Sequence, residues 1–343
     1  MGCYAGLDVS LEMTSICVVA ADGKVLREGK ALSEPEAVIA FLRGTGLLLE
    51  RVGLEAGALS EWLAVALEKA GLPVVCMEAR QVKAALSAMT VKTDRHDARG
   101  IAQIARTGWF KAVHVKSAGS QELRTLLGAR RHLVRKVADG EQLIRGLLRP
   151  LGLKVGPVTR RRFAERIREL VTDKPVLRAI FEPLLDAQGA LMLQLSRLHL
   201  LVLRAVREDP VCRRLTTMPG VGPVIALTYR SAVDDPQRFR RSRSVGAYLG
   251  LTPRKYQSGE VDRTGRISKA GDGDARAALF EAANVALRPS TRWSGLKAWA
   301  TQVAKRQGSK RAKVALARKM ACVLHRMWTD GTDFRWTSDA AAP

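Results

Sequence analysis

The sequence has few cysteines, no long apolar run and no recognisable targeting segment. Its five cysteines are widely scattered, with no C-x-x-C pair: Cys3, Cys17, Cys76, Cys212 and Cys322. Because an H-E-x-x-H segment is missing as well, neither a disulfide framework nor a zinc site is indicated. We find no run of transmembrane length and no signal peptide, and Gly6 stands where N-myristoylation requires serine or threonine. We therefore expect a cytoplasmic protein with no membrane partner, whose metal ligands, if any, are oxygen atoms.

Acidic residues are scarce relative to basic ones. The 343 residues include 57 lysines and arginines against 33 aspartates and glutamates, which gives a net charge of +24. Such a surplus favours a polyanionic partner, because basic side chains neutralise phosphates and release counterions. Nucleic acid is the usual partner, and an acidic membrane surface is the competing explanation. The length suffices for two domains joined by a helical segment.

The N-terminal part of the chain is predicted to alternate strands and helices. A hairpin turn is expected at 21–24. The predicted strands are Tyr4–Val9, Thr14–Ala20, Val25–Glu28, Arg51–Leu54 and Val74–Met77. The predicted helices are Pro35–Leu48, Leu59–Ala70 and Ala79–Met89. The order is β-β-β-α-β-α-β-α, and a further helix is expected within Val91–Ile104.

Acidic residues mark three places in this order. Asp8 ends the first strand, Glu55 follows the fourth, and Asp94 and Asp97 stand three residues apart where a helix is expected. Side chains at i and i+3 of a helix share one face, so these two carboxylates repel each other unless a cation lies between them. Carboxylate oxygens suit Mg²⁺ or Mn²⁺. The plainer interpretations are a turn residue at Asp8 and a solvent-facing Glu55.

The basic neighbours of the aspartate pair offer an alternative to a metal ion. Lys92, Arg95 and Arg99 lie on the same segment and would neutralise both carboxylates on a solvated helix face. His96 stands between the aspartates, and a lone helical histidine is more often structural than a ligand. The segment by itself leaves a metal site and a charged surface both open.

The middle of the chain, from Ser117 to Asp209, is predicted to be a helical arm. Apolar residues recur at spacings of three and four, and Leu185–Arg207 forms a last long amphipathic helix after Pro175 and Pro183. Such a pattern favours an antiparallel coiled coil that is either a spacer or an oligomerisation surface. Three consecutive arginines in its basic stretch are candidates for contact with a nucleic-acid backbone: Arg160, Arg161 and Arg162.

A glycine-containing turn follows the arm. In Thr216–Tyr229, Gly220 and Gly222 stand between helical flanks, where backbone N–H groups can approach a phosphate as in helix-hairpin-helix DNA contacts. The alternative is a tight turn that needs glycine for its backbone angles. The helices predicted beyond it are Arg276–Leu287 and Ser309–Asp330, with Gly331–Trp336 closing the ordered part and Thr337–Pro343 a frayed tail.

A serine in a basic loop is the candidate nucleophile. Ser258 precedes Gly259 within Ala247–Lys269, and a serine there could attack a phosphodiester while cations stabilise the developing charge. The cations are Arg254, Lys255, Arg263, Arg266 and Lys269. Residue chemistry alone does not favour Ser258 over Ser244 or Ser268, no general base lies beside it in sequence, and most loop serines are turn formers.

The order of elements and acids resembles the RNase H-like, RuvC-type nuclease core. Across nearly its whole length the chain resembles the DEDD insertion-sequence transposases, described as bridge-RNA-guided serine recombinases. The resemblance is carried by GLDVS, KTDRHDA, MPGVGPVIA, GLTPRKYQSG, GRISKAGD and LHRMWTDGTDFRW. It implies Asp8, Glu55, Asp94 and Asp97 as ligands of two divalent metals about 3.5–4 Å apart. It also implies Ser258, in the QSG element, as the nucleophile.

The resemblance further implies a fold, domains and partners. The expected fold is an α/β RNase H-like domain with a mixed sheet (1–115), a coiled-coil arm (116–210) and a mainly α transposase domain with a helix-hairpin-helix-like element (211–336), before a tail (337–343). Expected partners are target and donor DNA, a noncoding guide RNA and further copies of the chain as a dimer or tetramer. The bacterial nucleoid is the expected location.

Two other functions stay open. A hydrolytic RuvC-like junction endonuclease would use water as the nucleophile, with Ser258 uninvolved. A non-catalytic nucleic-acid-binding protein would use its acids structurally only. A sugar-kinase-like enzyme, which opens similarly, is disfavoured because no convincing glycine-rich phosphate loop is present.

Overall fold

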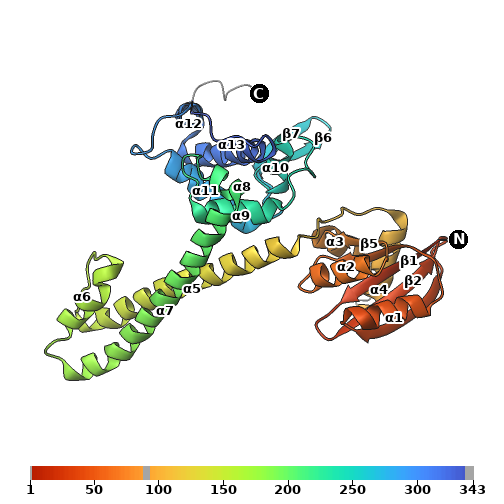
Figure 1. Cartoon of the computed structure of the whole chain (residues 1–343), viewed down its shortest axis with the longest axis horizontal. Helices are drawn as coiled ribbons and strands as arrows, with labels where there is room; N and C mark the ends of the chain where they lie inside the picture. The colour runs from red at the N-terminus through yellow and green to blue at the C-terminus, as the bar shows by residue number, and fades with distance from the viewer. Residues whose placement is uncertain (1, 88–92, 337–343) are drawn as a thin grey trace. The chain divides into compact units, whose positions relative to one another are not determined.

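The chain divides into two compact units, Met1–Lys116 and Ser117–Pro343. The computed structural model describes residues 2–87 and 93–336 (Figure 1). The last residues of the predicted helix Ala79–Met89 and the predicted tail Thr337–Pro343 lie outside the described residues. Each unit has hydrophobic clusters of its own, and each is described separately.

The first unit is built on a five-stranded mixed sheet with the strand order β3-β2-β1-β4-β5. Its strands are β1 (Cys3–Val9), β2 (Met13–Ala20), β3 (Val25–Leu32), β4 (Leu49–Glu55) and β5 (Val74–Met77). β1, β2 and β3 pair antiparallel, whereas β4 and β5 extend the other side of β1 in parallel. The predicted mixed sheet is therefore confirmed, with β3 running to Leu32 rather than ending at Glu28.

Different helices cover the two faces of this sheet. The helices are α1 (Pro35–Gly44), α2 (Ser60–Lys69), α3 (Ala79–Leu86) and α4 (Asp94–Thr107). Leu7 packs in one cluster with Val38 of α1 and Leu63 of α2, whereas Cys17 on the opposite face packs with Ala98 of α4. Successive side chains of a strand point to opposite faces, so alternate residues of β1 face α1 or α4.

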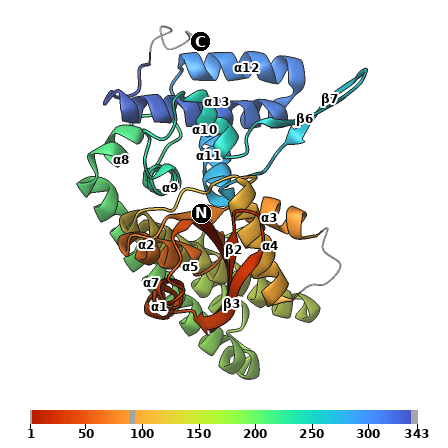
Figure 2. The same cartoon turned by 90° about the vertical axis from the view of Figure 1, so that its right-hand side faces the viewer.

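The second unit begins with two long helices that pack against each other. They are α5 (Ala118–Leu148) and α7 (Pro175–Glu208), joined through two 3₁₀ turns, Arg149–Leu151 and Arg160–Arg162, and α6 (Phe163–Leu170). Leu127 near the start of α5 packs with Val202 near the end of α7, and Ile144 near the end of α5 packs with Phe181. The two helices are therefore antiparallel (Figure 1), and Figure 2 views the second unit from another side. Coiled-coil geometry stays a prediction.

The prediction that the last arm helix begins at Leu185 is wrong. α7 begins at Pro175 and contains Pro183 inside it. Pro175 is in the first turn of the helix, where proline is well tolerated. Pro183 lies further inside and removes one backbone hydrogen bond, and packing of Phe181 and Leu185 on either side of it offsets that loss. By length and composition alone α7 is apolar enough to cross a membrane, although the sequence analysis found no such run. A single helix of that kind is weak support for a membrane span.

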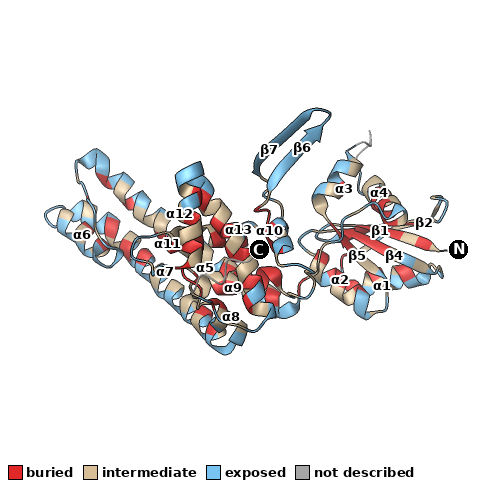
Figure 3. Ribbon diagram, turned by 90° about the horizontal axis from the view of Figure 1, so that it is seen from above, coloured by how far each residue is buried: buried red, intermediate tan, exposed pale blue. Residues whose placement is uncertain are grey.

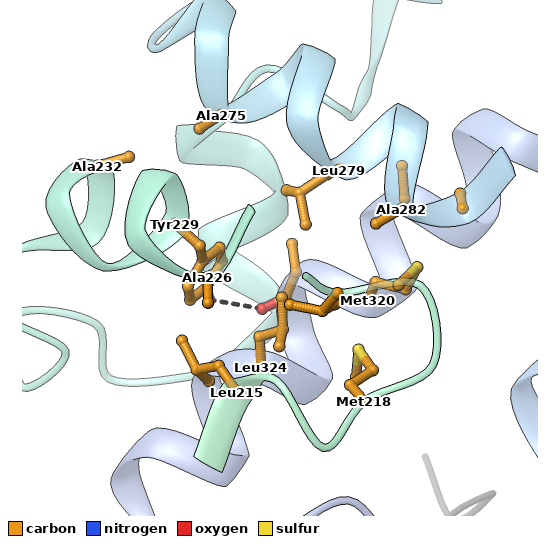
Figure 4. Close-up of a cluster of buried hydrophobic side chains, with 14 of the residues drawn as sticks. Leu215, Met218, Ala226, Tyr229, Ala232, Ala275, Leu279, Ala282, Met320 and Leu324 are labelled. Atoms are coloured by element: carbon orange, nitrogen blue, oxygen red, sulfur yellow. Dashed lines mark hydrogen bonds between the residues drawn. The ribbon is translucent and has the colours of Figure 1, made fainter. Parts of the chain in front are cut away.

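The C-terminal core is a cluster of shorter helices (Figure 4). They are α8 (Pro210–Leu215), α9 (Pro223–Val233), α10 (Arg243–Tyr248), α11 (Gly273–Ala286), α12 (Gly295–Gln307) and α13 (Ser309–Thr329). Tyr229 is fully buried and its hydroxyl donates to the Ala321 carbonyl of α13 at 2.7 Å. Phe334 joins the same cluster, so the closing segment is part of the core. The sequence predicted α11 and α13 but missed α10 and α12.

A two-stranded hairpin projects from this core. β6 (Pro253–Ser258) pairs antiparallel with β7 (Val261–Ile267), and nearly every residue of both strands is exposed (Figure 3). The sequence predicted a polar loop here, and the alternation of charged and small residues gave no apolar face from which to predict strands.

Candidate active site

Asp8 and Glu55 come together because of the register of two parallel strands. Leu7 of β1 is paired with Leu54 of β4, so the next residues along, Asp8 and Glu55, lie side by side at the same edge of the sheet. Both are half-buried, and both point to the face opposite Leu7 and Leu54. Neighbouring strands lie about 4.8 Å apart, which is the spacing expected between these two backbone positions.

Helix α4 lies on that same face and is held close by two glycines. Gly6 and Gly53 are paired across β1 and β4, two residues before Asp8 and Glu55. A Cβ atom at Gly6 would come within 2.2 Å of the Ala102 backbone nitrogen, and one at Gly53 within 2.3 Å of the Met77 methyl group. Glycine is therefore required at Gly6 because the backbone of α4 passes directly over it.

The direction of α4 brings its first turn toward the two strand ends. At its far end, Arg106 donates to the Ala21 carbonyl at 3.0 Å and Gln103 to the Gly23 carbonyl at 2.8 Å. Those carbonyls belong to the β2–β3 turn, beside the start of β1, where Cys3 pairs with Ala20. α4 thus runs opposite to β1. Its N-terminus lies at the same end of the sheet as Asp8 and Glu55, and its first turn contacts β3 through Asp94 and Arg95.

Asp94 and Asp97 occupy the first turn of α4, where the helix dipole favours negative charge. Thr93 caps the helix, its Oγ1 accepting from the His96 backbone N–H at 3.3 Å. Asp94 forms an ion pair with Lys30 of β3, with Nζ and Oδ2 3.5 Å apart. Among the described residues, the Asp97 carboxylate makes no ion pair or side-chain hydrogen bond.

The four acids have the donor chemistry of a hard divalent cation, since all offer carboxylate oxygens and no sulfur. In the part of the chain that the structure describes, however, no three acidic, histidine or cysteine side chains stand close enough together to hold a metal ion. The strand register brings Asp8 and Glu55 together, and Asp94 and Asp97 lie on α4 at the same end of the sheet. A divalent metal would have to draw these two pairs toward each other.

A charged cluster that the sequence analysis did not identify lies beside these acids. Glu28 of β3 accepts from Nε of Arg95 at 2.8 Å and lies 3.6 Å from Nε of Arg99. The hydrogen bond from Arg95 lowers the pKa of Glu28 below its usual range. Burial raises the pKa of the adjacent Cys17 thiol to about 11. Arg95 and Arg99 therefore neutralise Glu28, rather than the aspartates of α4.

Ser258 ends β6 at the tip of the exposed hairpin, where it pairs with Val261. Within the described residues its hydroxyl has no hydrogen-bond partner, and it is exposed. Ser268 differs, because its Oγ accepts from the Ala270 N–H at 3.3 Å. Ser244 is exposed on α10. Placement thus favours Ser258 or Ser244 over Ser268 as an accessible nucleophile.

The base of the hairpin is fixed by a residue that sequence reasoning missed. Arg276 of α11 donates from Nη1 to the carbonyls of Leu249 at 2.9 Å and Ala270 at 3.0 Å, one on each side of the hairpin. Gly250 and Gly271 have positive φ angles of 68° and 72°, and a Cβ atom on either would fall about 2 Å from backbone oxygen. No local pattern marks Arg276, because its partners are backbone carbonyls, and that of Leu249 lies 27 residues away.

The glycines of the turn before α9 differ in their surroundings. A Cβ atom at Gly220 would lie 2.2 Å from the Ala282 carbonyl of α11, so this glycine serves internal packing, and a phosphate contact there stays a prediction. Gly222 precedes α9 and faces open space. A helix-hairpin-helix element stays a prediction.

The predicted basic contacts are not equally available. Arg160 donates to Glu141 at 2.7 Å and Arg162 to Glu165 at 3.2 Å. Lys255 is paired with Asp262 at 3.0 Å. Three arginines are exposed and have no ion-pair partner among the described residues: Arg161, Arg263 and Arg266. Arg254 donates to the Ser268 carbonyl. Lys269 lies at the base of the hairpin and has a positive φ.

The fold and these residues define a two-part protein, with a carboxylate-bearing α/β unit and a basic helical unit that presents a serine on a hairpin. Residues 5–151 match a family model described as "Transposase", and residues 212–290 match one described as "Transposase IS116/IS110/IS902 family". Together these ranges take in more than half of the 343 residues. The chain belongs to the DEDD insertion-sequence transposases.

Individual relatives agree with this assignment. The chain is 28% identical over 340 residues to the transposase for insertion sequence element IS1111A of Coxiella burnetii, covering 96% of this chain and 90% of that protein. It is 29% identical over 250 residues to a probable family 20 transposase of Pseudomonas aeruginosa, covering 71% and 74%. Among solved structures it is similar to Thermus thermophilus RuvC, with 21% identity, a TM-score of 0.26, and coverage of 32% of this chain and 99% of that one.

Proposed function

We propose that this protein cuts and rejoins DNA strands as an insertion-sequence transposase, with divalent metal at Asp8, Glu55, Asp94 and Asp97 and with Ser258 as the nucleophile. The observation that carries the proposal is the Leu7–Leu54 register, which puts Asp8 and Glu55 side by side at the ends of two parallel strands. An arrangement serving stability alone has no need of two half-buried acids next to each other.

The carboxylates would hold Mg²⁺ or Mn²⁺ and thereby help position the scissile phosphate. When bound, such ions polarise the phosphoryl oxygens and steady charge on the attacking and leaving oxygens. Asp97 is the ligand most ready for this role, because its carboxylate has no partner among the described residues. Asp94 must first break its ion pair with Lys30 before it can bind a metal ion.

Ser258 would attack the phosphorus of a phosphodiester through its Oγ. A phosphoserine bond forms, the bond from phosphorus to the 3′ oxygen breaks, and the departing strand keeps a free 3′-hydroxyl after it takes up a proton. The reverse attack by a 3′-hydroxyl then rejoins strands without external energy. The exposed tip of the hairpin suits this role, because a serine there is accessible to a bound strand.

The partners of the reaction are proposed on the same basis. The net charge of +24 suits binding of phosphate backbones, while a noncoding bridge RNA would choose target and donor by base pairing. A homo-oligomer is supported by large apolar side chains left exposed on α5 and α7, among them Leu143, Leu193 and Leu200. A dimer or tetramer would cover them.

A trapping experiment tests the nucleophile. Purified protein is incubated with Mg²⁺, element-end DNA labelled on one strand and RNA transcribed from the element flank, then run on a denaturing gel. Wild type should form a protein–DNA adduct and Ser258→Ala should form none. Asp97→Asn should lower joining by 10³-fold or more, because a metal ligand contributes several kcal/mol to the transition state. The Glu36→Gln variant is a matched control, since Glu36 is an exposed first-turn acid on α1.

Each outcome separates the proposal from its alternatives. Cleavage without any adduct, unaffected by Ser258→Ala, would identify water as the nucleophile and favour a hydrolytic junction endonuclease. Joining that survives both Ser258→Ala and Asp97→Asn would leave the protein without the proposed site. An equal loss of strand joining in Glu36→Gln and Asp97→Asn would mean that removing either acid disturbs the fold rather than a metal site.

A further inference from the structure

A hollow lies beside the candidate carboxylates, on the α4 face of the sheet. It has a volume of about 260 Å³ and is called here the β2–β3 hollow. Its lining residues are Ser15, Ile16, Glu28, Gly29, Lys30 and Arg95. Small-molecule sites commonly have about 300–1,000 Å³, so this hollow fits a single phosphate group with its water better than a larger ligand.

Strand pairing connects the hollow to the catalytic edge. Asp8 pairs with Ser15 on β2, and Ser15 pairs in turn with Lys30 on β3. These three side chains therefore form one row on the α4 face, with Asp8 and Lys30 two strand spacings apart, or roughly 10 Å. Successive phosphates of one DNA strand are roughly 6–7 Å apart, because the strand winds around the helix axis, so this separation corresponds to one or two phosphate spacings.

Lys30 is the cation of the hollow that can change partners. Its ammonium group is paired with Asp94 at 3.5 Å, and the two side chains are 55% and 68% exposed. An ion pair so open to water is weak and easily exchanged. Arg95 is less free to change partners, because it is paired with Glu28. The Glu28 side chain is largely buried and also lies near Arg99.

Asp94 is also a proposed metal ligand, so Lys30 and a divalent cation compete for the same carboxylate. A cation bound at Asp94 leaves the Lys30 ammonium without its partner at the rim of the hollow. A phosphate of a strand crossing the carboxylate edge is the group that would then neutralise it.

We propose that the β2–β3 hollow is a phosphate subsite for the DNA strand, with Lys30 as its contact and with Asp94 as the group that holds Lys30 before metal and DNA bind. This deepens the proposed function and rests on it. The subsite lies about one or two phosphate spacings from the scissile bond. It explains why an exposed lysine stands in line with Asp8 across the sheet.

Two measurements on the full-length protein test this. Binding of Mn²⁺ alone is followed by calorimetry, and affinity for a duplex of fixed length and sequence is measured between 50 and 200 mM salt. Lys30→Met should bind Mn²⁺ about two- to fivefold more tightly, since an exposed ion pair is worth up to about 1 kcal/mol. With Mn²⁺ present, its log–log salt slope should fall by about 1, the share of one phosphate contact.

Lys24→Met is the matched control. Lys24 is exposed and lies next to the β2–β3 turn, at the end of the sheet away from the carboxylates, so neither its metal affinity nor its salt slope should change. An unchanged slope in Lys30→Met, or an equal change in both variants, overturns the phosphate subsite. Unchanged Mn²⁺ affinity in Lys30→Met overturns the exchange at Asp94.

Failure of the proposed function has a different signature. In that case the wild type binds no Mn²⁺ and forms no joined product, while the salt slopes of the two lysine variants still decide whether Lys30 contacts phosphate. Circular dichroism and thermal unfolding confirm that both variants keep the fold, which is expected because both side chains are exposed.

Discussion

Two neighbouring glycines serve the C-terminal core in different ways. Gly220 has a φ of 84° and lies against the Ala282 carbonyl of α11, so both its backbone angle and its surroundings exclude a side chain. Gly222 has a φ of −90° and open space where a side chain would project. The two glycines look equivalent in the sequence, and the structure shows that only Gly220 has surroundings that exclude a side chain.

Substitution of each glycine by alanine measures that difference. Gly220→Ala should lower the free energy of unfolding by about 3 kcal/mol or more, because overpacking and a left-handed backbone angle add. Gly222→Ala should change it by less than about 1 kcal/mol. Urea denaturation of the two variants and the wild type provides the comparison. Equal destabilisation by both substitutions would contradict the packing role of Gly220, and a loss of DNA binding in Gly222→Ala alone would support a backbone contact there.

At the residue scale, the sequence reveals acids that end strands but not their neighbours. Asp8 and Glu55 are recognisable because each follows a short apolar run, and local pattern is enough to place them at strand ends. Lys30 and Glu28 were missed, because their positions beside α4 depend on pairing of β3 with β2 and on a helix far along the chain. Neutralisation of the aspartates by Arg95 and Arg99 was the alternative to a metal site, and in the structure both arginines contact Glu28 instead.

At the scale of elements, the β6–β7 hairpin depends on its base for its orientation. Its strands are exposed except at Ile267, the last residue of β7, which packs against the core. Arg276 joins the carbonyls of Leu249 and Ala270, which enter and leave the hairpin. A hairpin held only at one end keeps a defined direction only while that end is rigid.

Replacing Arg276 should therefore loosen the hairpin without unfolding the core. In Arg276→Ala, hydrogen exchange of 250–271 should accelerate by about tenfold or more, because bonds to a charged donor are worth about 1.5–3 kcal/mol. Adduct formation by Ser258 should slow while duplex binding stays close to wild type. Arg288→Ala is the control, since Arg288 is an exposed arginine just beyond α11.

Two results would count against the role of Arg276. One is unchanged exchange in the hairpin together with unchanged adduct formation. The other is general acceleration of exchange through α9, α11 and α13, which would make Arg276 a structural residue of the whole core. Partial recovery in Arg276→Lys would support a positioning role, because lysine keeps the charge but bonds fewer carbonyls at once.

Elements with strong periodicity were predicted well, and those lacking it were not. β5 was predicted with its observed bounds, Val74–Met77, because it is a short continuous apolar run between breaks. The hairpin was missed because its strands have no apolar face. α12 was missed although Leu296, Ala300 and Val303 recur at helical spacing. Pro183 misled the prediction of α7, because a local helix-breaking signal was overridden by packing along the helix.

At the scale of the whole molecule, the surplus of cations sets how the protein meets nucleic acid. A net charge of +24 predicts strong and salt-sensitive binding to any phosphate backbone. The ion pairs show that this charge is unevenly available. Arg160 and Arg162 hold Glu141 and Glu165, whereas Arg263 and Arg266 on the hairpin are exposed with no acidic partner among the described residues.

Two charge-matched double variants distinguish local contact from net charge. Arg263→Gln with Arg266→Gln, and Arg160→Gln with Arg162→Gln, each remove two positive charges. If Arg263 and Arg266 contact phosphates directly, the first variant should lower the log–log salt slope of duplex binding by about 2, from about 0.9 per contact. The second should lower it by less, because its guanidiniums already hold carboxylates and those pairs must break before DNA is bound. Equal slopes in the two variants would mean that total charge, rather than the hairpin, determines how the backbone is held.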